Sequence, residues 1–82
     1  MGLNYGAATS AQLKAEIAAA DRSIRNVAAE LGSDYTTLFK VVTGKRPIRM
    51  QTVFDILGVL GVDPSAFFTR VQERAESERA PE

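Results

Sequence analysis

The hydrophobic positions of residues 23–44, SIRNVAAELGSDYTTLFKVVTG, repeat with the spacing of two short helices. The first half is apolar at the i, i+3, i+4 and i+7 positions of one buried stripe, which are Ile24, Val27, Ala28 and Leu31. The second half is apolar at Leu38, Val41 and Val42, and most of its other positions are polar. This pattern predicts two consecutive amphipathic helices.

The two predicted helices are joined by the four-residue turn Leu31-Gly32-Ser33-Asp34. Gly32 suits the left-handed backbone conformation that such a turn requires, and helices linked this closely cross at a steep angle. Ser23 and Asp34 are good N-cap residues for the two helices, and Gly44 ends the second. The segment is therefore predicted to be a helix-turn-helix, whose second helix offers its polar face to the DNA major groove.

Two further helical patterns follow this segment, and one precedes it. The preceding helix is expected from Thr9 or Ser10 to about Ala20, with Leu13, Ile17 and Ala20 facing inward. Residues 45–48 form a loop, since Pro47 disfavours a helical conformation in its predecessor. A fourth helix, about Met50 to Leu60, is expected to pack through these residues: Val53, Phe54, Leu57 and Leu60.

Asp63-Pro64 opens a fifth helix, because proline is preorganised for the first helical position. Its expected apolar residues are Phe67, Phe68 and Val71. No large apolar residue follows Gln72, so the rest is expected to be a helical extension in solvent or a tail. The predicted fold class is all-α, a compact bundle of five short helices. We divide the chain into a loose lead over 1–8, a domain over 9–71, and a polar extension or tail over 72–82.

Composition narrows the function classes. The chain has 82 residues, 45% of them hydrophobic and 24% charged, which suits one small globular domain. It contains neither cysteine nor histidine, so disulfides, zinc fingers and Cys/His nucleophilic chemistry are excluded. No apolar run approaches the roughly 18 residues of a membrane span, and no signal peptide opens the chain. A cytoplasmic location without membrane association is expected.

Charge is distributed unevenly along the chain. Net charge is zero, from 10 Lys plus Arg and 10 Asp plus Glu, but from Tyr35 to Phe54 every charged residue is basic. These four residues, here called the basic stripe, are Lys40, Lys45, Arg46 and Arg49. A local concentration of cations is what attraction to phosphates requires.

Three stretches, SIRNVAAELG, TTLFKVVTGKR and LGVLGVDPSAFF, together resemble the DNA-binding domain of lambda-type phage repressors, Cro proteins and xenobiotic-response-element regulators. The resemblance covers about Gln12 to Phe68. It implies a lambda-repressor-like fold and a sequence-specific regulator that binds double-stranded DNA, with base contacts from Tyr35, Thr36, Thr37 and Lys40. The chain departs from the family pattern at Ile24, where glutamine is common, at Arg49, where serine is common, and at Phe39, a position that is commonly polar.

Each base-contacting residue has a structural alternative. The ring of Tyr35 can belong to the core with only its hydroxyl exposed, Thr37 can bond back to its own helix, and Lys40 can be a solvated surface charge. Phe39 can meet thymine methyl groups, join a dimer interface or lie in the core. Phosphate contacts are expected from the following residues: Ser23, Arg25, Thr43, Lys45, Arg46 and Arg49. Arg22 is expected to be only a surface charge or ion pair.

The leading hypothesis is a small phage- or prophage-type repressor that occupies an operator as a homodimer. Two copies are expected because one domain with about four to six phosphate contacts binds weakly at physiological salt. The expected dimer surface is formed by Phe67, Phe68 and Val71, although at least one phenylalanine is expected in the core. The alternative is an antitoxin or protein-binding adaptor with the same fold. Asp55, Glu16 and Glu30 are expected on separate helices without metal-ligand spacing, so no enzyme activity, metal or cofactor is expected. No sensor domain is expected in so small a chain, and therefore no small-molecule ligand.

Overall fold

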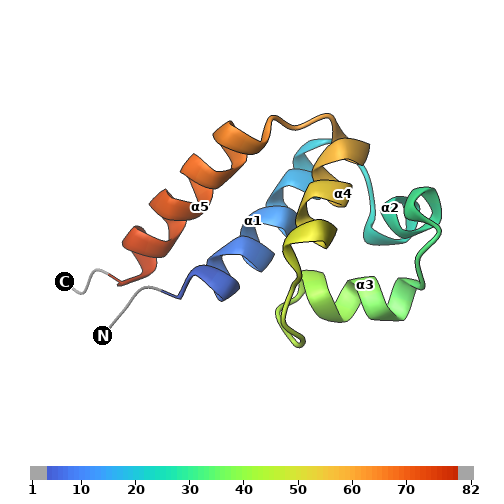
Figure 1. Cartoon of the computed structure of the whole chain (residues 1–82), viewed down its shortest axis with the longest axis horizontal. Coiled ribbons are helices and arrows are strands. Elements are labelled where there is room, and N and C mark those ends of the chain that lie inside the picture. The colour runs from blue at the N-terminus through green and yellow to red at the C-terminus, as the bar shows by residue number, and fades with distance from the viewer. Residues whose placement is uncertain (1–3, 80–82) are drawn as a thin grey trace.

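Residues 4–79 form five helices and no strand in the computed structural model, which describes this part of the chain. The helices are α1 (Tyr5–Ala19), α2 (Ile24–Leu31), α3 (Tyr35–Val42), α4 (Met50–Leu60) and α5 (Pro64–Arg79). Helix α5 lies along α1, while α2 and α3 form the opposite end of the molecule (Figure 1). The predicted all-α bundle of five helices is confirmed.

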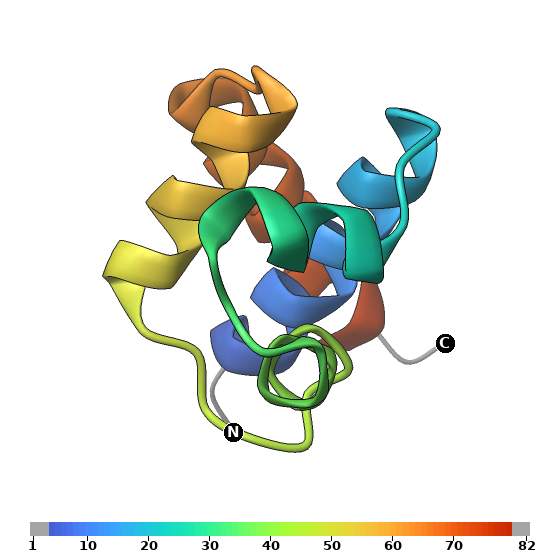
Figure 2. The same ribbon diagram turned by 90° about the vertical axis from the view of Figure 1, so that its right-hand side faces the viewer.

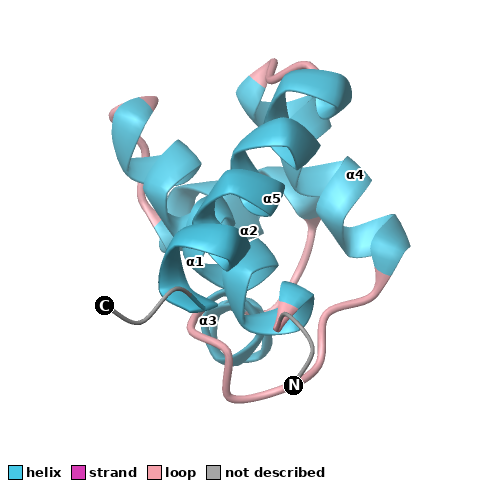
Figure 3. Cartoon of the chain, turned by 90° about the vertical axis from the view of Figure 1, so that its left-hand side faces the viewer, coloured by secondary structure: helices cyan, strands magenta, loops and turns pink. Residues whose placement is uncertain are grey.

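One hydrophobic core unites all five helices. Its fully buried side chains include Leu13 from α1, Val27 from α2, Val42 from α3, Ile56 from α4 and Phe67 from α5. Figure 3 shows the molecule from the side on which α1 and α5 face the viewer, with α3 below them. Because every helix contributes to this cluster, the position of α3 depends on the packing of the whole domain.

Helix α1 begins earlier than predicted. The carboxamide oxygen of Asn4 accepts a hydrogen bond from the Ala7 N–H at 3.0 Å, which caps the helix before Tyr5. The hydroxyls proposed as caps bond within the helix or across the core: Thr9 donates to the Tyr5 carbonyl and Ser10 to the buried Val41 carbonyl. The predicted start at Thr9 or Ser10 was therefore wrong, and residues 1–3 of the predicted lead lie outside the described residues.

Two predicted core assignments and the predicted dimer surface need correction. Ala20 is the exposed C-cap of α1 and does not face inward. Phe54 is 43% exposed, and Ile56 takes the buried position on α4 that the sequence interpretation did not name. Phe67 and Val71 are 0% and 3% exposed, so neither can form the predicted dimer surface without unfolding the core. Phe68 is half-buried and contacts Phe67 and Phe54 edge to face.

Helix α5 continues beyond the predicted domain boundary at residue 71. Ala75 is 3% exposed and belongs to the same core cluster as Ala8, so packing extends through residues expected to lie in solvent. Residues 80–82 of the predicted tail lie outside the described residues. The sequence did not predict this contact because the side chain of Ala75 is small and the prediction relied on large apolar residues.

A polar network holds α5 on α1. The Glu16 carboxylate accepts hydrogen bonds from Gln12 at 2.9 Å and from the Arg70 guanidinium at 2.7 Å, and Arg74 donates to the Gln12 carboxamide at 3.1 Å. Gln12 and Glu16 are each 8% exposed, and every buried side-chain polar atom among the described residues has a partner. The network therefore avoids the free-energy cost of an unpaired buried carboxylate.

No single helix among residues 4–79 is long and apolar enough to cross a membrane. Only α4 and α5 taken together are long and apolar enough for a span, and these two helices are bent by 117° relative to each other.

Replacing Phe67 by leucine is expected to lower the free energy of unfolding by about 1–3 kcal/mol, because the smaller side chain leaves unfilled space in the core. Phe54→Leu is the matched control on an exposed phenylalanine, and it should change stability by no more than about 0.5 kcal/mol. Urea unfolding followed by circular dichroism measures both. Equal effects of the two substitutions would contradict the assignment of Phe67 to the core.

Candidate nucleic-acid interface

The turn between α2 and α3 brings the two helices together as the sequence predicts. Gly32 adopts the left-handed conformation, with φ 67° and ψ 30°. The next amide, of Ser33, donates to the Ala28 carbonyl at 2.9 Å and closes the end of α2. Ala28 itself is 2% exposed and belongs to the hydrophobic core cluster. Val27 and Ala28 are buried while Ile24 and Leu31 are half-buried, so the predicted stripe on α2 is confirmed.

Helix α3 lies along one edge of the molecule (Figures 1 and 2). Leu38, Val41 and Val42 face the core, as predicted. Thr36 and Lys40 are exposed and, being four residues apart, share the outer face of the helix. The packing of the molecule therefore leaves this pair accessible to a partner.

Asp34 fixes the start of α3. Its carboxylate accepts hydrogen bonds from the Thr37 N–H at 3.0 Å and from the Thr37 hydroxyl at 3.2 Å. The side chain of Thr37 is exposed, and its hydroxyl is engaged with the cap residue rather than with its own helix backbone. Thr37 therefore has a structural role in addition to its predicted base contact.

The loop after α3 folds back onto the end of that helix. The Lys40 carbonyl accepts hydrogen bonds from the Lys45 N–H at 2.8 Å and the Arg46 N–H at 3.2 Å. Gly44 allows this reversal with a φ of 82°, and the Thr43 hydroxyl donates to the Phe39 carbonyl at 2.6 Å. These bonds hold the backbone of two residues of the basic stripe against the C-terminal end of α3.

The basic stripe is fully displayed on the surface. All four of its side chains are exposed. The ion pairs between described residues, Arg22 with Glu30 and Arg70 with Glu16, use none of them. Arg22 also donates to Asn26, which confirms that it is a surface ion pair rather than part of the stripe.

The remaining predicted phosphate-contacting residues lie at the start of α2 and α4. The Ser23 hydroxyl accepts a hydrogen bond from the Asn26 N–H at 3.0 Å and caps α2, whose first turn carries no acid. Arg25 is exposed in this turn, and its guanidinium carbon lies 4.2 Å from the centre of the Tyr35 ring. Arg49 precedes α4 in extended conformation and makes no side-chain cap bond.

Tyr35 and Phe39 form an aromatic pair along one flank of α3. Both are half-buried, and their ring centres are 5.8 Å apart. The Lys45 ammonium lies 6.0 Å from the Phe39 ring centre. The sequence singled out both aromatic residues but did not predict their pairing with cations from other elements, since that depends on how α2 and the loop lie against α3.

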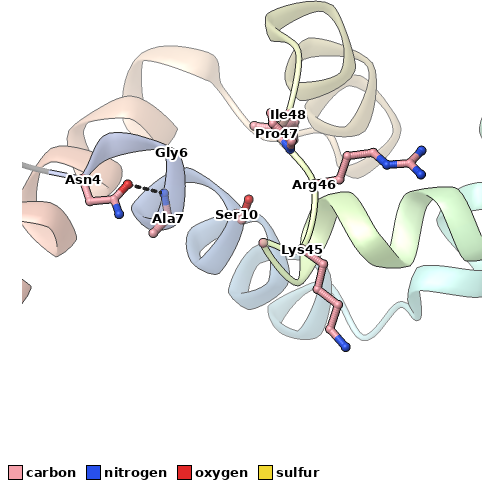
Figure 4. Close-up of a pocket in the computed structure, with 9 residues that line it drawn as sticks. Asn4, Gly6, Ala7, Ser10, Lys45, Arg46, Pro47 and Ile48 are labelled. Atoms are coloured by element: carbon pink, nitrogen blue, oxygen red, sulfur yellow. Dashed lines mark hydrogen bonds between the residues drawn. The ribbon is translucent and has the colours of Figure 1, made fainter.

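A hollow of about 330 Å³ separates the start of α1 from the loop at residues 44–48. The charged ends of Lys45 and Arg46 point away from it, and the Asn4 carboxamide oxygen is bonded to the Ala7 N–H (Figure 4). No three Asp or Glu side chains converge as metal ligands within residues 4–79.

Two helices joined by a left-handed glycine, with an exposed polar second helix and flanking cations, define a helix-turn-helix DNA-binding domain. A helix-turn-helix family model matches residues 13–67, more than half of the chain. The chain belongs to the Cro/C1-type helix-turn-helix family and is a DNA-binding transcription regulator with a lambda-repressor-like domain. Searches of curated proteins and of solved structures each returned no match.

Asp34→Ala is expected to lower the free energy of unfolding by about 0.5–2 kcal/mol, because α3 loses its N-cap. Thr37→Val removes only the hydroxyl that bonds to the same carboxylate, and it should cost less than Asp34→Ala. Urea denaturation of the two variants measures the difference. A greater loss of stability from Thr37→Val would show that Asp34 does not act mainly through the helix backbone.

Proposed function

We propose that this regulator is a small repressor of the phage type, which occupies a DNA operator as a homodimer in the cytoplasm and blocks polymerase. The observation that supports the proposal most directly is the exposed pair Thr36 and Lys40, with Lys45 and Arg46 bonded through their amides to the Lys40 carbonyl. In this proposal the base-reading groups of α3 and the phosphate-binding groups of its loop approach the DNA together, as groove recognition requires.

Base recognition is assigned to the outer face of α3. The Lys40 ammonium suits O6 and N7 of guanine, while Thr36 offers a hydroxyl to a base edge and a methyl to thymine. Tyr35 contributes through its hydroxyl and Thr37 through its methyl, since the Thr37 hydroxyl is held by Asp34. These residues lie at the start and on the outer side of the helix, from where side chains reach base edges in the major groove.

Phosphate recognition is assigned to the residues around that helix. The members of this set are Ser23, Arg25, Thr43, Lys45, Arg46 and Arg49. Cations in the set neutralise phosphates on both sides of the groove and release counterions, so binding should weaken steeply as salt is raised.

A second copy is proposed to dock on α4 rather than on the buried residues of α5. Met50 and Phe54 are 58% and 43% exposed and lie one turn apart on the same face. Phe54 contacts the half-buried Phe68 with ring centres 6.0 Å apart, so these three side chains form a continuous apolar patch. Dimer binding to a two-fold repeated site would supply the affinity that one domain lacks.

The adaptor or antitoxin alternative gains no specific support. An exposed apolar surface at Phe39 or Phe67, together with an acidic tail, would favour it, but Phe67 is completely buried and Phe39 is half-buried.

Selection from random duplexes should return a half-site repeated about a dyad. Lys40→Ala is expected to cost about 1–3 kcal/mol of binding free energy and to relax the preference at one base position. Arg46→Ala is the matched control for a phosphate contact: it should weaken all sequences alike and reduce the salt slope by about one. Gel shift across a salt series measures both. Tight binding to one cellular protein with no duplex preference would instead support the adaptor.

Phe54→Glu is expected to abolish dimerisation while leaving the monomer folded, because the side chain is already partly in solvent. Binding to the two-fold operator should weaken by roughly 10²-fold, and binding to a single half-site should not change. Analytical ultracentrifugation and gel shift measure the two effects. Gln51→Glu places the same charge elsewhere on the exposed surface of α4 and should leave the dimer intact; an unchanged dimer in Phe54→Glu contradicts the proposed surface.

A further inference from the structure

The side chain of Arg25 does not extend freely into solvent but lies over an aromatic face. Its guanidinium carbon is 4.2 Å from the ring centre of Tyr35, which is within the range of a cation–π interaction. Arg25 comes from the first turn of α2 and Tyr35 from the first turn of α3. The contact therefore joins the two helices of the motif on the surface that carries the proposed DNA contacts.

The ring of Tyr35 is itself held in place. Phe39 packs against it with ring centres 5.8 Å apart and planes inclined by 36°, and both rings are half-buried. At the far end of this row Lys45 approaches Phe39 only to 6.0 Å, at the limit of the interaction, so the inference concerns Arg25 alone.

A guanidinium held over a ring can still form hydrogen bonds. Its N–H groups lie in its own plane, and those that do not point at the ring can donate to a phosphate. Free arginine loses considerable rotamer entropy when it binds, and a side chain already held on a ring loses less. The Tyr35 ring thus reduces the conformational cost of an Arg25–phosphate contact.

The Arg25–phosphate contact matters more because the side chain of Ile24, the residue before it, cannot bind a phosphate. Ile24 is the first residue of α2 and has no polar group with which to reach a phosphate. Arg25 is the cationic side chain of that turn. Arg25 therefore supplies the charge for phosphate binding at the start of α2, beside the uncharged Ser23, and its placement depends on a residue of α3.

We propose that Tyr35 is a positioning residue: its ring face holds the Arg25 guanidinium as a preformed clamp for a DNA phosphate beside the start of α2. This inference rests on the proposed function, because it requires the protein to bind duplex DNA through this surface. It assigns the ring face of Tyr35 to a role separate from any base contact by its hydroxyl.

A double-mutant cycle on duplex binding tests the coupling. Arg25→Ala alone should weaken binding about tenfold and lower the salt slope by about 0.9, as expected for the loss of one phosphate contact. Tyr35→Leu alone should weaken binding roughly three- to tenfold, because the arginine is released. In the Tyr35→Leu background, Arg25→Ala should then cost no more than about threefold. An equal effect of Arg25→Ala in both backgrounds, or no effect in the wild-type chain, would overturn the proposal.

Matched variants separate the ring from the hydroxyl. Tyr35→Phe and Tyr35→Trp keep an aromatic face, so the full effect of Arg25→Ala should persist in both. If Tyr35→Phe removes that effect as Tyr35→Leu does, the hydroxyl is responsible and the proposal fails. Arg49→Ala is the control for specificity of the coupling, because the Arg49 side chain does not lie over Tyr35 or Phe39. The effect of Arg49→Ala on binding should be the same in the wild-type and Tyr35→Leu backgrounds.

A measurement without DNA distinguishes failure of this inference from failure of the proposed function. In the free protein, ring current should shift the side-chain NMR signals of Arg25 upfield, and the shift should remain in Tyr35→Phe and disappear in Tyr35→Leu. If the shift is absent in the wild-type protein, the Tyr35 ring does not hold Arg25, and the proposal is overturned even if the protein binds DNA. If the shift is present but no duplex is bound, both the DNA-binding function and the phosphate clamp are rejected.

Discussion

The short turn between α2 and α3 is the constraint on which the DNA-binding surface depends. The left-handed backbone of Gly32 allows two eight-residue helices to meet across this turn. Helices of this length are marginal alone, so their stability comes from burial of Val27, Leu38 and Val42 in the common core. With its inner face held there, α3 can present only Thr36, Lys40 and their neighbours to a partner.

Features determined by local chemistry could be predicted from the sequence. The N-caps Ser23 and Asp34, the left-handed Gly32 and the opening of α5 at Asp63-Pro64 each depend on residues a few positions apart, and each is present. The exposure of Thr36 and Lys40 followed from helical periodicity because the opposite face of α3 is strongly apolar.

Features determined by tertiary contact could not be predicted as well. Phe54 and Phe67 are chemically identical, and only the path of α5 decides that one is exposed and the other buried. Ala8 and Ala75 have too little apolar area to be predicted as core residues from the sequence, yet both are buried where α1 meets α5. The contact between Arg25 and Tyr35 joins separate helices, and no spacing rule relates them. Gln12 with Glu16 and Arg70 with Arg74 are each four residues apart, a complementary spacing that could have suggested the network between α1 and α5.

The backbone bonds from Lys45 and Arg46 to the Lys40 carbonyl have a consequence for how this domain can change its target. They involve main-chain atoms, so they survive whatever side chain occupies position 40. If residues 36 and 40 read bases as proposed, a lineage can exchange them for others and acquire a new preferred sequence while the loop at residues 44–46 keeps its place. The backbone geometry of the loop would then stay the same while the recognised sequence changes.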